Sequence, residues 1–320
     1  MKFITYSELN KDLIENIFKI PRDIDLIVGI PRSGLVLACM IGLYMNKPVT
    51  DLDAFLQERF YSVGKTKNHN DIIREFSQTK KVLIVEDTVC SGNSIRDAKQ
   101  KVKKYVGTMK IIYLAAYTRR ETRELVDINF KDIDDDRVFE WNYLHNTLLE
   151  RACVDMDGVL CIDPTEEEND DGWKYKKFIE TAKIKLLPTR KIGYIVTSRL
   201  EKYREETEAW LHKNNIQYNK LYMMDFASAQ ERRKLGNHAE YKAKIYKQLK
   251  DTCWFIESNN FQAQRIAEMT GKGVFCIESR VFYPENYIRE ARVKMKYEVI
   301  RPLKRRLKLC LFNLKKWRGN

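Results

Sequence analysis

Residues Lys81–Ser94, K-V-L-I-V-E-D-T-V-C-S-G-N-S, decide the fold of the first half of the chain. The short apolar and mostly β-branched run 82–85 is typical of a strand buried in a parallel sheet. Glu86 and Asp87 follow at its carboxyl end, and a small polar loop leads into a helix expected over about 95–105. Open α/β sheets bind ligands beyond the carboxyl ends of their strands, and a helix amino terminus preceded by Gly and hydroxyl residues attracts phosphate. Because the two carboxylates can accept hydrogen bonds from sugar hydroxyls, the stretch predicts a site for a phosphorylated sugar.

A second strand, loop and helix lie earlier in the chain. After a short amphipathic helix expected over 11–18, residues 25–28 predict a strand, and G-I-P-R-S-G over 29–34 is a loop before a helix expected over 35–45. The loop offers backbone N–H groups and the Arg32 guanidinium to an anion. Each loop alone is also typical of a plain strand-to-helix turn, and the pair of them favours an anion site.

Together the two loops resemble the type I phosphoribosyltransferases, whose signature for phosphoribosyl diphosphate (PRPP) is four apolar residues, two acids and a short Thr/Ser–Gly loop. The resemblance implies a Rossmann-like parallel sheet and Mg²⁺ as a cofactor. It implies that Glu86 and Asp87 bind the 2- and 3-hydroxyls of ribose, and that the loop 88–94 holds the 5-phosphate. Arg32, with Mg²⁺, would stabilise the departing diphosphate. The residues that the resemblance assigns to PRPP are Arg32, Ser33, Gly34, Glu86, Asp87, Thr88, Val89, Cys90, Ser91, Gly92, Asn93 and Ser94.

The polar and irregular stretch 58–78 contains several basic residues, among them Arg59, Lys65 and Lys67. Loops of this length in compact domains are lids or solvated surface loops. The family has a mobile loop at the corresponding place that closes over PRPP and excludes water. Asp53 and Glu58, which lie beside this stretch, are candidate bases for the acceptor hydroxyl.

Cys90 disfavours a purine acceptor. Purine salvage enzymes of this family carry an Asp three residues after the second acid, where it assists the purine ring nitrogen. Cys90 stands at that position, and a thiol of ordinary pKa is a poor substitute. Orotate-like and alcohol acceptors stay open.

A second acidic loop begins after the apolar residues 152–154. Two carboxylates at i and i+2 beyond a strand can hold Mg²⁺ and divide the work between attack on phosphorus and proton transfer. The stretch D-M-D-G-V-L, residues 155–160, resembles the first motif of the haloacid-dehalogenase-like (HAD-like) phosphohydrolases. The resemblance implies that Asp155 is the nucleophile and Asp157 the general acid and base. Only about 36 residues separate Asp157 from the next strand, so a minimal cap is expected.

Further motifs of the same family follow in order. The expected strand 192–196 leads to Thr197, which would hydrogen-bond the phosphoryl group. Lys242 would stabilise the phosphate, with Lys244 as the alternative. The expected strand 254–256 leads to Glu257, which would complete a Mg²⁺ site with Asp155 and Asp157; the family usually has an aspartate there. Each motif alone is common in surface loops, but four in order are unlike a chance pattern.

Composition sets the broad class. The chain has 320 residues, of which 44% are hydrophobic, and seven cysteines without a C-x-x-C pair. The length predicts about two domains. The cysteine usage indicates a reduced cytoplasmic protein and not a disulfide framework or zinc site. The amino terminus lacks the apolar core of a signal peptide, and no apolar run reaches the roughly 18 residues of a spanning helix.

The net charge of +13 is concentrated at the carboxyl-terminal end of the chain. Residues 289–320 hold twelve Lys or Arg against two Glu, which leaves only +3 for the rest. Within 301–320, apolar residues recur at helical spacing between basic ones: Leu303, Leu307, Cys310, Leu311, Leu314 and Trp317. A basic amphipathic helix with a Trp predicts binding to an anionic membrane surface. A helix docked on the body and a nucleic-acid contact are the alternatives.

The sequence therefore predicts three parts, a phosphoribosyltransferase domain (1–150), a HAD-like phosphatase domain (151–288) and a membrane-associating tail (289–320). The combination resembles the bifunctional proteins of bacterial surface-polysaccharide synthesis. It implies transfer of 5-phosphoribosyl from PRPP to a glycan hydroxyl, expected to be lipid-linked, and then removal of the 5-phosphate to leave a β-ribofuranosyl residue. The expected location is cytoplasmic, on the inner face of the membrane, with no nucleic-acid partner. The alternative is a soluble nucleobase phosphoribosyltransferase of the orotate or pyrimidine type, or a PRPP-binding regulator, fused to a small-molecule phosphatase.

Overall fold

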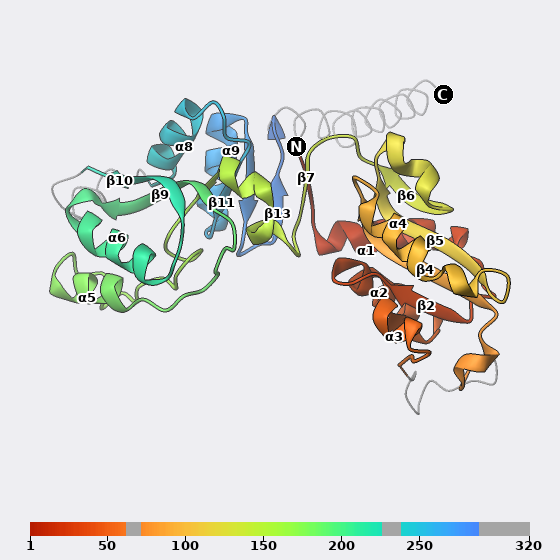
Figure 1. Cartoon of the computed structure of the whole chain (residues 1–320). Coiled ribbons are helices and arrows are strands. Elements are labelled where there is room, and N and C mark those ends of the chain that lie inside the picture. Colours follow the sequence, from red (N-terminus) through yellow and green to blue (C-terminus); the bar gives the residue numbers. More distant parts are fainter. Residues whose placement is uncertain (62–71, 226–237, 288–320) are drawn as a thin grey trace, which may run out of the picture. The chain divides into compact units, whose positions relative to one another are not determined.

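The computed structural model describes residues 1–61, 72–225 and 238–287. The chain divides into two compact units, Met1–Trp141 and a second that begins at Asn142. Each unit is built on a parallel sheet with helices packed against it (Figure 1). The predicted class, α/β with two parallel-sheet domains, is confirmed. Within the described ranges, no helix is both long and apolar enough to cross a membrane.

The first unit has a five-stranded sheet in the order β3-β2-β4-β5-β6, in which every neighbouring pair is parallel. Its strands are β2 (Leu26–Gly29), β3 (Val49–Asp51), β4 (Lys81–Val89), β5 (Lys110–Thr118) and β6 (Ile128–Asp132). A separate parallel pair joins β1 (Lys2–Ile4) to β7 (Arg137–Phe139). The helices are α1 (Tyr6–Asn16), α2 (Ser33–Met45), α3 (Leu52–Leu56) and α4 (Asn93–Lys101). Short 3-10 helices lie at Ile17–Lys19, Phe76–Gln78, Lys103–Tyr105 and Arg120–Leu125.

Alternate residues of β4 point to the two helical layers of the first unit. Leu83 and Val85 pack with apolar residues of α1 and α2. Val82 and Ile84 pack with those of α3 and α4. The central strand is therefore covered on both faces, as its continuous apolar run predicts.

The structure corrects the expected end of β4. The sequence places the strand at 82–85, but pairing with β5 continues through Glu86 and Thr88, which lie opposite Ala115 and Tyr117. The two acids therefore lie within the paired strand and not in a loop beyond it. Likewise, α1 begins at Tyr6 instead of residue 11.

The second unit has a six-stranded sheet in the order β10-β9-β8-β11-β12-β13. Its strands are β8 (Ala152–Val154), β9 (Ile192–Leu200), β10 (Tyr218–Met224), β11 (Trp254–Glu257), β12 (Gly273–Cys276) and β13 (Val281–Tyr283), and only β13 is antiparallel to its neighbour. The helices are α5 (Trp173–Thr181), α6 (Arg204–Lys213), α8 (His238–Gln248) and α9 (Asn260–Thr270), with 3-10 helices at Tyr143–His145, Thr147–Arg151 and Glu201–Tyr203. Helices α8 and α9 share a buried cluster with the sheet, and Figure 1 shows α6 on the other side of β9 and β10.

Two of the sequence predictions concern residues outside the described ranges. The tail 289–320, with its expected amphipathic helix, lies there, as does the middle of the expected lid, including Lys65 and Lys67. At the described edge of the expected lid, Tyr61 forms an isolated bridge with Val49.

Candidate active sites

The first predicted PRPP loop, 29–34, packs against the carboxyl-terminal part of β4, just before the second loop. Ile30 donates its backbone N–H to the Val85 carbonyl at 2.9 Å. A Cβ on Gly34 would lie 2.6 Å from the Val85 oxygen and 3.1 Å from Glu86 Oε1. Gly34 is thus needed for the close approach of the first loop to the acids.

The acids at the end of β4 are both buried. Burial, with the neighbouring Asp87 charge, raises the pKa of Glu86 to about 9. Asp87 Oδ2 accepts a hydrogen bond from Trp141 Nε1 at 2.8 Å. Glu86 is therefore a neutral carboxyl at pH 7, and it can donate one hydrogen bond to a sugar oxygen as well as accept others.

The loop that follows Glu86 and Asp87 leads into helix α4. Gly92 caps the helix with φ 82°, and a Cβ there would lie 2.4 Å from Leu125 Cδ1. Ser91, Asn93 and Ser94 are exposed, which leaves their polar groups open to an anion. Thr88 Oγ1 is buried and has no hydrogen-bond partner among the described residues. An unpaired buried hydroxyl and a helix amino terminus are a suitable combination for an oxygen-rich ligand.

The sequence prediction overlooked Arg96 and treated all loop residues alike. Arg96 Nη1 donates to the Ser91 carbonyl at 2.9 Å, so a cation stands beside the loop. The signal available in the sequence was the position of Arg96 one turn into the helix, which places a cation near the loop. Val89, by contrast, is buried, while Cys90 is exposed. Arg32 and Ser33 lie at the start of α2, with the Arg32 side chain exposed and the Pro31–Arg32 peptide cis.

The two candidate acceptor bases follow a different strand, β3. Asp53 is in the first turn of α3 and Glu58 follows that helix, both after β3. Among the described residues, no hydrogen bond or ion pair joins either of them to Glu86 or Asp87.

In the second unit, Lys242 of α8 connects the ends of β8 and β11. Its Nζ lies 2.6 Å from Asp155 Oδ2, 2.7 Å from Glu257 Oε2 and 3.0 Å from Gln262 Oε1. Burial opposes the charge of this lysine, but the two carboxylates outweigh it and raise the Lys242 pKa. Lys244, the alternative from the sequence, is exposed on the other side of the same helix.

Asp155 is buried beside this ammonium. Burial raises the pKa of Asp155 above its ordinary value, and the adjacent Lys242 ammonium opposes this by favouring the carboxylate form. Its Oδ1 accepts from the Met156 N–H at 2.8 Å, which holds the carboxylate with Oδ2 toward Lys242. The group is thus an oriented carboxylate in a low-dielectric site.

Arg199 binds Asp157, and the sequence prediction gave this arginine no role. Arg199 is fully buried, and its Nη2 lies 2.6 Å from Asp157 Oδ1. Cys161 Sγ lies 3.3 Å from each of these two groups. Thr197 is buried and accepts the Arg199 N–H at 3.2 Å. The strand β9 continues to Leu200, beyond the expected end at 196, and this extension fixes both residues.

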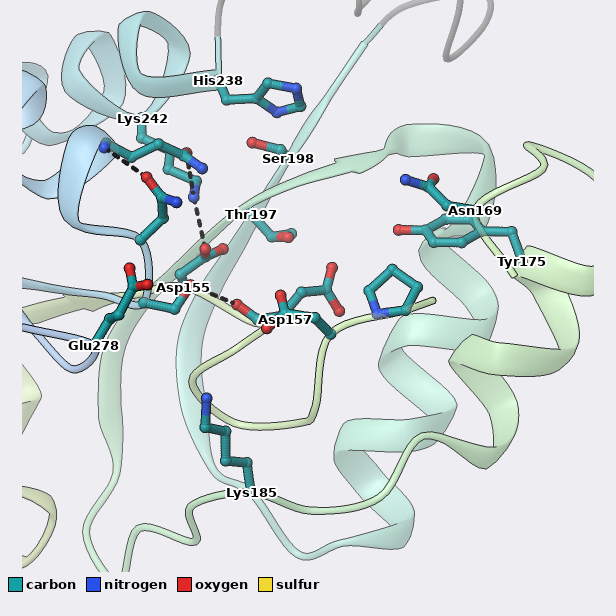
Figure 2. A pocket seen from close by; sticks show the side chains of 15 residues that line it. Asp155, Asp157, Asn169, Tyr175, Lys185, Thr197, Ser198, His238, Lys242 and Glu278 are labelled. Carbon is teal, nitrogen blue, oxygen red and sulfur yellow. Dashed lines mark hydrogen bonds and ion pairs between the residues drawn. The ribbon is translucent and has the colours of Figure 1, made fainter. Parts of the chain in front are cut away.

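A cavity of about 510 Å³ brings these groups together. Figure 2 shows Asp155, Asp157, Thr197 and Lys242 around it, with Tyr175 and Asn169 on one side and Lys185 on another. The last three residues come from the stretch between β8 and β9, which the sequence analysis treated only as a minimal cap.

The charges of Asp155, Asp157 and Glu257 suit Mg²⁺ better than their arrangement does. Three carboxylates face two cations in this cluster, and hard oxygen donors suit Mg²⁺. Yet Arg199 pairs with the Asp157 carboxylate, whereas Lys242 pairs with those of Asp155 and Glu257. In the part of the chain that the structure describes, no group of three His, Cys, Asp or Glu side chains is arranged to hold a metal ion. Asp155 and Glu257 therefore fit a cation, whereas the expected third ligand, the Asp157 side chain, does not join them.

Comparisons with known proteins identify the first unit. Residues 5–147 match a family model described as a phosphoribosyl transferase domain. The N-terminal half of the chain thus contains a type I phosphoribosyltransferase domain.

Solved structures similar to the chain include a purine phosphoribosyltransferase from Pyrococcus horikoshii Ot3 (22% identity, 44% of this chain, 92% of that chain, TM-score 0.32). A Helicobacter pylori xanthine-guanine-hypoxanthine phosphoribosyltransferase (17%, 44%, 93%, TM-score 0.34) and an orotate phosphoribosyltransferase from Aeropyrum pernix (18%, 40%, 70%, TM-score 0.28) are also similar. A search of the curated proteins finds no match.

Proposed function

We propose that the chain is a bifunctional enzyme that transfers 5-phosphoribosyl from PRPP to a hydroxyl of a glycan and then removes the 5-phosphate. The observation that carries this proposal is the presence of two different strand-end sites in one chain. One has a hydroxyl-rich loop before a helix amino terminus, at Thr88–Ser94. The other has a buried carboxylate, Asp155, beside a buried ammonium, Lys242. The first fits binding of a sugar phosphate, and the second fits attack on phosphorus.

In the transfer step, Glu86 and Asp87 hold the ribose hydroxyls and the α4 amino terminus holds the 5-phosphate. The acceptor hydroxyl gives its proton to a base, for which Asp53 and Glu58 are the candidates, its oxygen attacks C1 of the sugar, and the bond from C1 to the diphosphate oxygen breaks. In-line attack on α-configured PRPP gives a β-ribofuranoside. Arg32, exposed in the first loop, offers its guanidinium to the departing diphosphate.

In the hydrolytic step, Asp155 Oδ attacks phosphorus and the ribose 5-oxygen leaves. Water then cleaves the aspartyl-phosphate, which restores Asp155 and releases phosphate. Lys242 and the Thr197 hydroxyl bind the phosphoryl oxygens, and Asp157, held by Arg199, serves the proton transfers. Asp155 and Glu257 would hold Mg²⁺, which supplies positive charge to the phosphoryl group.

The test is purified protein with PRPP, Mg²⁺ and a synthetic glycan acceptor, followed by mass spectrometry. Wild type is expected to yield the ribosylated glycan, and Asp155→Asn the phosphoribosylated glycan. Turnover of orotate, uracil or a purine in place of every glycan would support the nucleobase alternative.

We propose in addition that residues 301–320 bind the inner surface of the cytoplasmic membrane, close to a lipid-linked acceptor. This rests on the sequence alone, on alternating basic and apolar residues at helical spacing. Co-sedimentation with anionic liposomes should be lost when 301–320 are removed. Equal sedimentation of both proteins would refute the membrane role.

A further inference from the structure

A second cavity, of about 560 Å³, lies in the first unit beyond the carboxyl ends of β5 and β6. Tyr117 of β5 and Lys131 of β6 line it, and Asp12 of α1 faces them. None of these residues belongs to the PRPP loops, and the transfer step as described leaves them without a task.

Asp12 is the centre of a fixed polar network in this cavity. Its side chain is buried, although carboxylates are seldom buried without partners. Its Oδ2 accepts from the Tyr117 hydroxyl at 3.0 Å, and its Oδ1 pairs with Lys131 Nζ. The half-exposed Lys131 ammonium leaves donors free to turn toward a ligand. The network therefore presents rigidly held oxygens and an ammonium to the cavity.

The sheet connects this cavity to the PRPP site. Thr88 lies in register with Tyr117 on β5, and Tyr117 lies in register with Lys131 on β6. Neighbours in register on parallel strands point to the same face of a sheet. The row thus runs from Thr88 of the proposed phosphate loop, whose hydroxyl has no hydrogen-bond partner among the described residues, into the cavity.

Arg137 of β7 forms hydrogen bonds to both the base of the phosphate loop and the wall of the cavity. This buried arginine donates from Nη2 to the Val89 carbonyl at 3.2 Å, at the base of the phosphate loop. From Nη1 it donates to the Ile133 carbonyl at 2.6 Å, in the cavity wall. The cavity wall is therefore held in place relative to the loop that begins at Thr88.

The wall of the cavity indicates the chemistry of its occupant. Four cations and five carboxylates line it, and its apolar members are only Ile4, Tyr117 and Ile133. A planar nucleobase needs apolar surface on which to stack, and pockets for such ligands are mostly apolar. A sugar carries many hydroxyls that both donate and accept, so it can satisfy carboxylates and ammonium groups together. We infer that this cavity is the acceptor site of the transferase and that it takes a polyhydroxylated sugar.

This inference rests on the proposed transfer, and its test uses the full chain carrying Asp155→Asn, so that products keep their phosphate. The probes are octyl glycosides of glucose, galactose, rhamnose and N-acetylglucosamine, with orotate, uracil and hypoxanthine as competing acceptors. In this background, Tyr117→Phe, Lys131→Gln and Asp12→Asn are compared with Glu15→Gln, a change on the exposed face of the same helix α1. Mass spectrometry gives the rates, and calorimetry gives PRPP binding.

We expect at least one glycoside to be phosphoribosylated. Loss of a hydrogen bond to a bound ligand should raise its KM about tenfold in the cavity variants, with PRPP affinity within about twofold of the parent. Glu15→Gln should match the parent. If Asp12→Asn fails to fold, the other two variants decide.

The outcomes separate this inference from the proposed function. PRPP binding with turnover of a base only, or of no glycoside, overturns the sugar acceptor. Glycoside turnover that is unchanged in the cavity variants overturns the location of the site while leaving the proposed function intact. Absence of PRPP binding by the parent overturns the proposed function itself.

Discussion

Arg199 holds Asp157 by a two-pronged ion pair, with Nη2 at 2.6 Å from Oδ1 and Nε at 3.2 Å from Oδ2. The arginine is completely buried while the aspartate side chain is 20% exposed, so the pair lies at the inner wall of the cavity with its acid facing outward. An acid fixed in this manner cannot turn toward Asp155 and Glu257 unless the arginine releases it.

Removal of this arginine should cost both stability and phosphatase activity. Arg199→Ala leaves a mostly buried Asp157 charge unpaired, and breaking a buried pair costs about 3–5 kcal/mol of unfolding free energy. Urea unfolding of the two proteins measures this. Arg199→Lys keeps the positive charge but loses the two guanidinium N–H donors that bind Asp157 together. The variant should therefore fold, but it should hydrolyse p-nitrophenyl phosphate more slowly than wild type. Full activity of Arg199→Lys would show that the geometry of the pair is unimportant.

Lys242 should be essential for hydrolysis and dispensable for transfer. Lys242→Met removes the ammonium that two buried carboxylates share, and loss of one preorganised charge commonly lowers kcat by about 10²–10³-fold. The rate with p-nitrophenyl phosphate gives the size of the loss. Lys244→Met, an exposed neighbour on the same helix, is the matched control and should retain the wild-type rate. Similar losses in both variants would mean that the helix, and not the ammonium, matters.

The Glu86 carboxyl should make the first unit less stable as the pH rises. Its pKa is raised to about 9 in the folded chain from an ordinary value of 4.5, so between these pH values the folded state binds the extra proton. Stability falls with increasing pH wherever the folded state binds more protons, by at most about 1.4 kcal/mol per pH unit for one group. Glu86→Gln, which is neutral throughout, should lose stability less steeply between pH 5 and 9. Urea unfolding at several pH values measures the two slopes, and parallel slopes would contradict the raised pKa.

Gly34 should not tolerate a methyl group. Its Cβ would lie 2.6 Å from a backbone oxygen, which cannot move as a flexible side chain can. Gly34→Ala is therefore expected to destabilise the fold by about 1–3 kcal/mol and to weaken PRPP binding. Gly172→Ala, where the nearest atoms are at 3.4 Å or beyond, is the control. Calorimetric melting and PRPP titration report the two effects, and equal behaviour of both variants would refute the close contact.

Local patterns predicted the strands that are short apolar runs, such as β2, β8 and β11, but not β3, β6 and β10, which contain polar residues. They also contain signals that the sequence analysis left unused. Thr5 and Glu8 form a capping box that starts α1 at Tyr6, and the T-x-x-E spacing of this box is visible in the sequence. The continuation of β4 through Glu86 was less accessible, because the pairing partner of a strand is not a local property.

In the candidate sites, too, residues with a local signal were predictable and contacts between distant residues were not. Residues that directly follow strands, such as Asp155 and Glu86, could be found from position and type. Residues that act across the fold could not: Trp141 reaches Asp87 from 54 positions away, and Arg199 reaches Asp157 from 42. Nothing local distinguishes these side chains from ordinary aromatic or basic residues. The antiparallel edge strand β13 is a similar case, because the direction of its pairing depends on the turn that precedes it.

The extension of β4 has a thermodynamic consequence for recognition. Since Glu86 and Asp87 are part of the hydrogen-bonded ladder with β5, folding has already removed the conformational freedom of their backbone. In the proposed transfer, a ribose that docks on them would have little protein entropy to overcome, whereas the exposed Ser91 and Asn93 would have to become ordered around the phosphate. The sugar end of the proposed ligand would therefore meet a rigid surface and the phosphate end an adaptable one.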